Sequence, residues 1–547
     1  MKTNVFLCMA AALMVAACGD PSHRHSSGEK VSVINSEPDE VMEEEVEVTS
    51  NEAALMEPSA NATSKMILSS PPPPQQRNAE TYKEIKENSF VAVAQQPVTT
   101  FSADVDRAAY ANVRRIIGYG QIPPKDAVRI EEMVNYFDYD YPAPEEGSAS
   151  PLRVSPELAP APWNPNHLLL RIGLQAKKID LAKAPPSNIV FLIDVSGSMD
   201  EDNKLPLLKS SFKMLLGQLR PDDKIAIVTY ANGTKVALPS TSVKDKEKII
   251  KVLDNLYASG GTSGGRGIQL AYEQAQKSFI KNGNNRIILA TDGDFNIGIN
   301  NTTDLEKFIE KQRESGIYMS VLGFGIGNYR DDMAETIADK GNGNYAYIDN
   351  ITEAKKVLVN ELSGTLFAVA KDVKLQLEFN PKYVKEYKLI GYENRMLANE
   401  DFTNDKKDAG EIGAGHTVTA LYELVPSDGK VAQSLRYQSQ ELNEKGKGNE
   451  LGFLKIRYKD PKVKDAKSVE ITEPLVFNKK ALKETSTDYR FAASVAEFGI
   501  LLRDNSNKAN ATYDQVIELA EEAIGKDPEG YRKEFVRLVK SVKMLPK

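Results

Sequence analysis

The stretch Asn188 to Asp200, NIVFLIDVSGSMD, is the part of the sequence that decides the fold. Its apolar residues Val190 to Ile193 predict a buried strand, and Asp194 follows at the end of that strand. Two hydroxyl side chains, Ser196 and Ser198, come directly after it. Because these three side chains are all hard oxygen donors, the end of this strand is a candidate cation site.

Short apolar strands and amphipathic helices alternate from residue 186 to about residue 368. The strands are predicted at NIVFLIDVS, KIAIVTYA, KVALP, NRIILATDG, IYMSVLGFGI and GNYAYID. This alternation is typical of an α/β fold with a doubly wound, mostly parallel sheet. KVALP follows KIAIVTYA so closely that we expect it to be an antiparallel edge strand.

The remaining ordered sequence lies on both sides of this central domain. Residues 97–185 are predicted to form helices and then two strands, and they constitute an N-terminal associated region. Residues 369–480 favour an antiparallel β region, and residues 481–547 favour a small helical region with apolar stripes. We expect the segments before and after the central domain to complete shared domains.

The N-terminus is typical of an exported, lipid-anchored protein. Residues 1–18, MKTNVFLCMAAALMVAAC, resemble a bacterial lipoprotein signal peptide, with Cys18 as the residue that receives the lipid. An ordinary secretory signal with an incidental cysteine is the alternative. Residues 19–96 are acidic and proline-rich, and they predict a disordered tether. We therefore expect a bacterial cell-envelope location, on the periplasmic face or at the outer membrane.

Composition narrows the classes of function. The two cysteines are Cys8, inside the signal, and Cys18, so no disulfide or cysteine metal site is expected. The net charge is −8 and no stretch is rich in Lys and Arg, which disfavours nucleic acid as a partner.

Two further loops can reach the edge of the sheet at which Asp194 lies. Ligands of open α/β sheets bind beyond the carboxyl ends of the strands. Thr262, in ASGGTSGGRG, precedes a predicted helix, and Asp292, in LATDGD, ends a predicted strand. With Asp194 and the two serines they make a set of oxygen donors that suits Mg²⁺, with Mn²⁺ or Ca²⁺ as alternatives, and does not suit zinc. A hydroxyl-rich turn without a metal is the structural alternative.

DVSGSM, GGTSGG and TDGD together resemble the metal-ion-dependent adhesion site (MIDAS) of von Willebrand factor type A domains. The pattern of that family is Asp-x-Ser-x-Ser, a distant Thr and a distant Asp. All of its positions are filled here, by Asp194, Ser196, Ser198, Thr262 and Asp292. The resemblance implies metal-dependent protein binding, in which an Asp or Glu carboxylate of a partner completes the coordination of the ion.

The sequence around the central domain resembles a narrower family. TFSADVDRAAY and VRIEEMVNYFDYDYP precede the domain, and GAGHTVTALYELVP and YRFAASVAEFGILLRDN follow it. They are similar to the YfbK-type bacterial envelope lipoproteins, over roughly residues 97–547. The resemblance implies a membrane-associated protein that interacts with other proteins.

Three other functions compete with this interpretation. A hydrolase would need a nucleophile beside a base, but DVSGSM is not a G-x-S-x-G elbow, and His416 more plausibly supports a turn. We therefore expect no enzyme activity. An adaptor for a cytoplasmic ATPase conflicts with the signal peptide, and a purely structural scaffold would not need the complete set of metal ligands.

Overall fold

The computed structural model describes residues 79–103, 106–262, 264–293, 302–428, 448–463, 466–504 and 508–546. The predictions for the signal peptide, for Cys18 and for the first part of the tether lie outside the described residues. Within the described ranges, no helix is both long enough and apolar enough to span a membrane.

The central sheet has the strand order β10-β9-β8-β5-β6-β7. Its strands are β5 (Ser187–Asp194), β6 (Lys224–Tyr230), β7 (Thr234–Ser242), β8 (Asn284–Thr291), β9 (Ile317–Gly323) and β10 (Tyr345–Tyr347). All neighbours pair in parallel except β6 and β7, which are antiparallel. The predicted fold class, with its single antiparallel edge strand, is confirmed.

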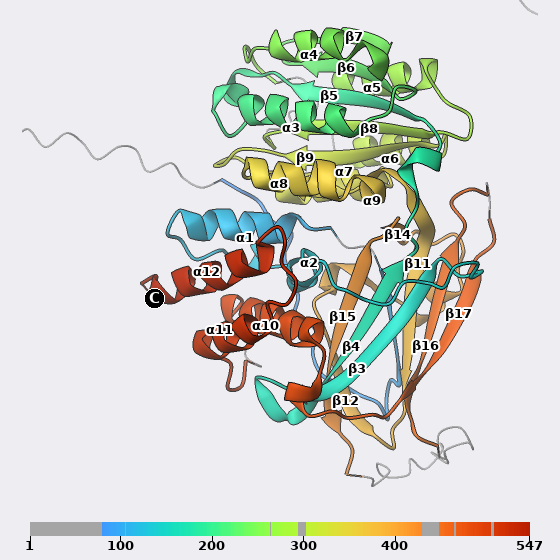
Figure 1. Cartoon of the computed structure of the whole chain (residues 1–547), viewed down its shortest axis with the longest axis vertical. Coiled ribbons are helices and arrows are strands. Elements are labelled where there is room, and N and C mark those ends of the chain that lie inside the picture. The colour runs from blue at the N-terminus through green and yellow to red at the C-terminus, as the bar shows by residue number, and fades with distance from the viewer. Residues whose placement is uncertain are drawn as a thin grey trace, which may run out of the picture. The chain divides into compact units, whose positions relative to one another are not determined.

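Helices cover both faces of this sheet (Figure 1). They are α3 (Leu205–Gln218), α4 (Lys246–Asp254), α5 (Gly264–Lys277), α6 (Thr302–Arg313), α7 (Asp331–Lys340), α8 (Ile351–Lys355) and α9 (Leu362–Leu366). In β5, Phe191 belongs to the core under α3, whereas its neighbours Val190 and Leu192 belong to the core under α5. Because β5 is buried on both faces, its sequence is a continuous apolar run.

Two antiparallel sheets lie beside the central one. The first has the order β1-β12-β15-β4-β3 and the second β13-β2-β11-β16-β17, with β14 also paired to β11. Their strands are β1 (Val91–Ala92), β2 (Val98–Ser102), β3 (Leu152–Ala161), β4 (Asn164–Ala176), β11 (Ala368–Phe379), β12 (Val384–Ile390), β13 (Met396–Leu397), β14 (Gly410–Gly413), β15 (Thr417–Pro426), β16 (Glu450–Lys459) and β17 (Val469–Val476).

Both sheets combine strands from before the central domain with strands from after it. Thr100 of β2 is paired with Gln376 of β11, and Arg171 of β4 with Leu421 of β15. One apolar core includes Phe101, Leu170 and Leu377 from both sheets. The β region that we expected at residues 369–480 therefore does not form a sheet of its own, because its central strands take N-terminal strands as neighbours.

A helical unit is likewise built from both ends of the chain (Figure 1). It contains α1 (Ala108–Gly118), α2 (Ile130–Asn135), α10 (Thr487–Leu502), α11 (Tyr513–Glu522) and α12 (Tyr531–Met544). Phe137, which follows α2, packs edge to face on Phe491 of α10 and on Phe535 of α12. The apolar stripes that the sequence shows in the C-terminal helices are thus covered in part by N-terminal residues.

The predicted tether ends earlier than its composition suggested. Val91 and Ala92 form β1, which pairs with β12, and Val93 is buried. Glu80 forms an ion pair of 2.9 Å with Arg115, and the Ala79 amide donates to the Gly327 carbonyl. The described part of the tether, residues 79–96, is therefore packed. The short apolar run FVAVA provides the contact area that the average composition of the tether conceals.

Buried ion pairs join the central domain to the N-terminal helices. Arg114 of α1 donates to Asp349 at 2.8 Å and to Glu353 of α8 at 2.7 Å. Arg107 pairs with Glu361, between α8 and α9. Because the chain passes from α9 into β11 with only Phe367 between them, these contacts hold the last helical segment of the central domain at both ends.

A buried acid in α10 predicts a pH dependence of stability. Glu497 is fully buried, and burial raises its pKa to about 8, which the Thr512 backbone opposes only in part. In the unfolded chain the pKa is near 4.5. Between these two values the folded state keeps a proton that the unfolded state has lost, so this group makes the protein less stable as pH rises.

We expect Glu497→Gln to remove this contribution. Its free energy of unfolding, relative to that of the wild type, should rise with pH by up to roughly 1.4 kcal/mol per unit across that window. Urea denaturation of both proteins at about pH 5 and about pH 8 measures the difference. Glu522→Gln, at an exposed site of α11, is the matched control and should show no such trend.

Candidate metal centre

Asp194 is the last residue of β5, at the carboxyl edge of the central sheet. Its side chain is completely buried, and its Oδ1 accepts a hydrogen bond of 2.8 Å from the Ser196 amide. The other oxygen, Oδ2, is buried and meets no donor in good hydrogen-bond geometry within the described ranges. The Tyr230 hydroxyl is a neighbour that stabilises this carboxylate in part, and a cation at Oδ2 would compensate the buried charge further.

Ser196 and Ser198 stand beside it in the turn that leads into a short 3-10 helix, Gly197–Asp200. Their Oγ atoms are 3.0 Å apart. Ser196 is buried and Ser198 is exposed, so the pair extends from the sheet edge to the surface. Both hydroxyls are thus placed side by side.

The loop that carries Thr262 lies against this turn. The Gly197 amide donates to the Gly260 carbonyl, and the Ser259 amide donates to the Val195 carbonyl, each at 2.8 Å. Gly260 has φ +79°, and a Cβ there would lie 2.3 Å from the Asn232 amide nitrogen, so the loop needs glycine. Thr262 follows two residues later and is partly exposed; among the described residues, no hydrogen bond joins its side chain to the other four.

Asp292 reaches the same edge through β8. This strand pairs in parallel with β5, with Ala290 opposite Ile193, so Asp292 lies just beyond the strand end and next to Asp194. It is 4% exposed. Burial raises the pKa of Asp194 to about 7, and the neighbouring charge of Asp292 adds to this rise, while Ser196 opposes it. A cation would favour the ionised form of Asp194.

The structure adds Lys204, which the sequence analysis missed. Its ammonium lies 3.3 Å from Asp292 Oδ2 and donates to the Ser198 carbonyl at 2.9 Å. A third contact, of 3.2 Å, joins it to Glu201. The sequence DEDNK resembles a solvated helix start, and only the tertiary fold turns this lysine inward.

The donor chemistry fits a hard divalent ion. Two carboxylates and neighbouring hydroxyls are ligands that Mg²⁺ accepts, and no histidine or cysteine takes part. In the described part of the chain, no group of three or more His, Cys, Asp or Glu side chains is arranged to hold a metal. A site at Asp194 would therefore depend on its hydroxyl donors.

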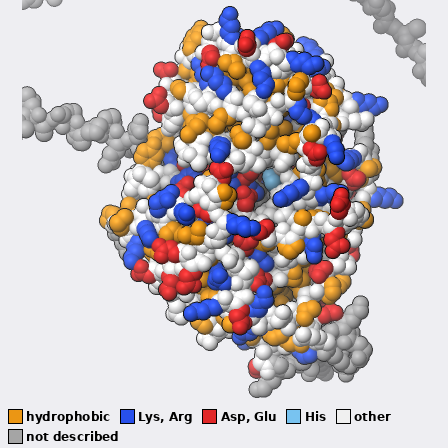
Figure 2. Space-filling view, in the orientation of Figure 1, with side chains coloured by type: hydrophobic (Ala, Val, Ile, Leu, Met, Phe, Trp, Pro, Cys, Tyr) orange, Lys and Arg blue, Asp and Glu red, His pale blue; other side chains and the backbone are white. Residues whose placement is uncertain are grey.

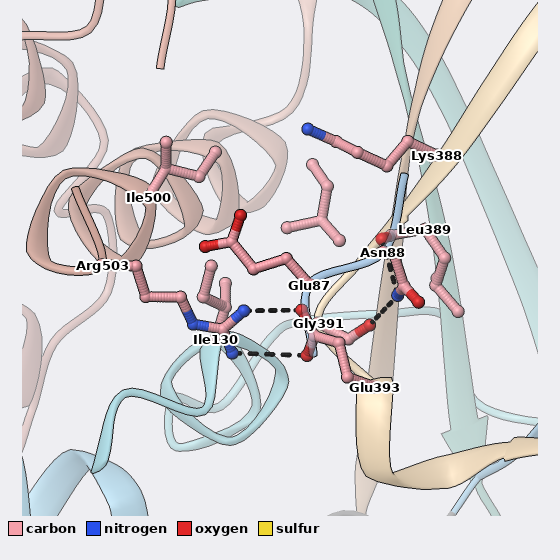
Figure 3. A pocket seen from close by; sticks show the side chains of 10 residues that line it. Glu87, Asn88, Ile130, Lys388, Leu389, Gly391, Glu393, Ile500 and Arg503 are labelled. Carbon is pink, nitrogen blue, oxygen red and sulfur yellow. Dashed lines mark hydrogen bonds and ion pairs between the residues drawn. The ribbon is translucent and has the colours of Figure 1, made fainter. Parts of the chain in front are cut away.

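A pocket away from this edge is lined mainly by charged and apolar side chains. Figure 3 shows it between β12 and α10, with Arg503 paired to Glu393 at 2.5 Å and Asn88 donating to backbone carbonyls of β12 and its end. None of its ten lining residues is a Ser, Thr, Cys or His. The pocket therefore offers no hydroxyl or thiol nucleophile and no imidazole base, and the Glu393 carboxylate in it is paired with Arg503.

His416 lies at a second small cavity, lined also by Arg107 and Asn135. Burial lowers its pKa to about 4. A Cβ on Gly364 would lie 1.9 Å from its Nε2, so the ring packs directly on the helix α9. This is a packing position between the central domain and the β sheets, in keeping with the structural role that the sequence suggested.

Comparison with protein families identifies three matching segments. The von Willebrand factor type A domain matches residues 188–360, which contain all five predicted metal ligands. A family described as von Willebrand factor matches residues 76–171, and the family described as "Uncharacterized protein YfbK, C-terminal" matches residues 364–545.

Whole-chain relatives agree with these matches. The chain is 48% identical to YfbK of Escherichia coli K12 over 465 residues, which cover 84% of this chain and 80% of the relative. It is 26% identical to protein sll0103 of Synechocystis, over 60% of this chain and 74% of that protein.

Among solved structures, a von Willebrand factor type A protein of Catenulispora acidiphila aligns with a TM-score of 0.40 at 14% identity, covering 84% of this chain and 91% of that one. BatB of Bacteroides thetaiotaomicron aligns with a TM-score of 0.28 at 23% identity, covering 32% of this chain and 97% of that one.

Proposed function

Because the chain belongs to the YfbK family and carries a von Willebrand factor type A domain, we propose that it is a metal-dependent protein-binding component of the bacterial cell envelope. In this proposal Asp194, Ser196, Ser198, Thr262 and Asp292 hold Mg²⁺, or alternatively Mn²⁺ or Ca²⁺. An Asp or Glu carboxylate of a partner protein then binds to the ion. Lipid on Cys18 attaches the protein to the membrane.

The observation that carries this proposal is the meeting of Asp194, the two serines and Asp292 at one edge of the sheet. The parallel pairing of β5 with β8 brings the two carboxylates to that edge, and the backbone bonds at Gly197 hold the Thr262 loop against it. Asp194 Oδ2 is buried and meets no donor in good hydrogen-bond geometry, so a cation there would lower the cost of burying this carboxylate.

The surroundings of the site favour an anionic ligand. With a divalent ion bound, the neutral hydroxyls would leave much of its charge uncompensated. Helix α5 begins at Gly264, two residues after Thr262, and the amino end of a helix carries partial positive charge. Ser198 is exposed, so a partner side chain can approach.

Protein binding is also favoured over catalysis and over a bare scaffold. The serines at the site have no histidine beside them, since the described histidines lie at β4 and before β15. A scaffold role would not need the full set of five predicted oxygen donors at the sheet edge. The face drawn in Figure 2 mixes basic and acidic side chains, without a basic stripe that would suit nucleic acid.

The proposed regions of the chain keep the boundaries that the sequence suggests, although those before and after the type A domain share their sheets and their helical unit. They are the signal peptide at 1–18, a tether that starts at 19, the associated region to 185, the type A domain at 186–368, the β region to 480 and the helical region to 547. The type A domain would present the metal edge, and the other parts would hold and orient it.

Asp194→Ala is expected to weaken Mg²⁺ binding by at least about 100-fold, because it removes the buried carboxylate on which the site is built. The sheet below is packed from both faces, so the circular dichroism spectrum should not change. Calorimetric titration with Mg²⁺ measures the affinity. Asp200→Ala, an exposed acid of the same turn, is the matched control and should bind like the wild type. Equal affinity of the wild type and Asp194→Ala would disprove the metal site.

A further inference from the structure

Lys204 places a fixed positive charge at the edge of the candidate metal centre. Its ammonium contacts Asp292 Oδ2 at 3.3 Å and the Ser198 carbonyl at 2.9 Å. Asp292 and Ser198 are both predicted metal ligands, so the lysine contacts the carboxylate of one and the backbone of the other. It is therefore part of the site, although lysine itself cannot bind a cation.

The ammonium is held in this position by packing. The Lys204 side chain is only 6% exposed, although lysine is rarely buried unless it is paired. Its stem lies on Gly325, which has φ +81° and where a Cβ would lie 2.3 Å from Lys204 Cε. The third partner, Glu201, is 58% exposed, so water screens its charge and Asp292 is the stronger partner.

The charge balance follows from these contacts. Two ionised carboxylates, Asp194 and Asp292, carry two negative charges, and Lys204 carries one positive charge. A divalent ion that joins them must share Asp292 with the ammonium and lies close to a like charge. Among the buried groups, the loaded site then holds three positive charges against two negative ones, and the exposed Glu201, which water screens, offsets the excess only in part, so the loaded site favours an anion.

We propose that Lys204 tunes this site: it lowers the affinity for the divalent ion and raises the affinity of the loaded site for a carboxylate. The inference rests on the proposed metal-dependent function and deepens it. The Lys204 charge is a second reason to expect an anionic ligand, and it is independent of the open coordination position on the metal ion. Removal of the lysine charge should therefore change the two affinities in opposite directions.

Lys204→Met, which keeps the stem and removes the charge, tests this proposal. Calorimetry should show Mg²⁺ binding that is tighter by roughly tenfold than in the wild type. Acetate should bind the Mn²⁺-loaded variant more weakly than the Mn²⁺-loaded wild type, again by roughly tenfold, as measured by water-proton relaxation. Lys213→Met, in the helix α3 that Lys204 precedes and 40% exposed, is the matched control and should change neither affinity.

Several outcomes separate this inference from the function on which it rests. If the wild type binds none of Mg²⁺, Mn²⁺ and Ca²⁺, the proposed function fails and the inference fails with it. If the wild type and Lys204→Met bind Mg²⁺ and acetate equally, or both affinities change in the same direction, the inference is wrong while the metal site stands.

Folding is controlled with a second variant. Lys204→Gln also removes the charge but keeps a hydrogen-bond donor for the Ser198 carbonyl, and the result is taken from the variant whose circular dichroism matches the wild type. If neither variant folds, the lysine is a structural requirement and its assigned role as a tuning charge is overturned.

Discussion

Replacing Asp331 with alanine is expected to lower the free energy of unfolding by about 3–5 kcal/mol. Asp331 begins α7 of the central domain and is completely buried. Its Oδ2 accepts a bond of 2.5 Å from Arg129, and its Oδ1 accepts bonds from Asn112 and Tyr345. Without Asp331, the 2% exposed Arg129 keeps an incompletely compensated charge in the interior, and this accounts for the large loss.

Urea denaturation followed by tryptophan fluorescence and circular dichroism measures this loss. Asp332→Ala is the matched control, because its side chain is 34% exposed and its partner Arg330 is also exposed; a change below about 1 kcal/mol is expected. Asp331→Asn keeps the shape of the side chain and removes only its charge, so it separates the contribution of the charge to stability from that of the hydrogen bonds. If Asp331→Ala is as stable as the wild type, the ion pair does not hold α7 to the N-terminal segment.

Phe535→Ala is expected to cost about 3–5 kcal/mol as well, because it opens a cavity among aromatic rings. Phe535 lies in α12 and is completely buried. Its ring centroid is 5.5 Å from those of Phe491 and Phe498 in α10 and 5.7 Å from that of Phe137. The substitution should therefore also loosen the packing around Phe137, almost 400 positions earlier in the chain.

Limited proteolysis with mass spectrometry identifies where the variant opens. New cleavage near Phe137, together with cleavage in α12, is the expected result, since both surround the same cavity. Met544→Ala, in the same helix but 78% exposed, should leave stability and cleavage pattern unchanged. Cleavage confined to α12 would show that the helical unit does not fold together with the N-terminal segment.

The central domain could be predicted from the sequence because its strands and helices are each recognisable from a short stretch of residues. The buried strand Val190 to Ile193 is apolar on both faces, and each strand is followed by a helix of recognisable period. In a parallel sheet, strand ends converge at one edge, so Asp194 and Asp292 could be placed together without coordinates.

The sequence was less informative about the flanks, because their pairing partners are far apart in the chain. Nothing local in β2 at 98–102 indicates that it pairs with β11 at 368–379, since any antiparallel neighbour would satisfy its backbone. The start of the ordered chain was also missed, because residues 79–96 gain their stability from contacts with distant residues such as Arg115 and Lys385.

The sequence by itself determined the fold class, the candidate ligands and the family resemblance, because each depends on residue type and short-range spacing. Only the tertiary structure decided that Lys204 faces Asp292 and that Asp331 faces Arg129. The physical reason is the same in both cases. A charged residue near a helix start is normally solvated, and whether it is instead buried depends on which opposite charge the folded chain brings within a few ångströms of it.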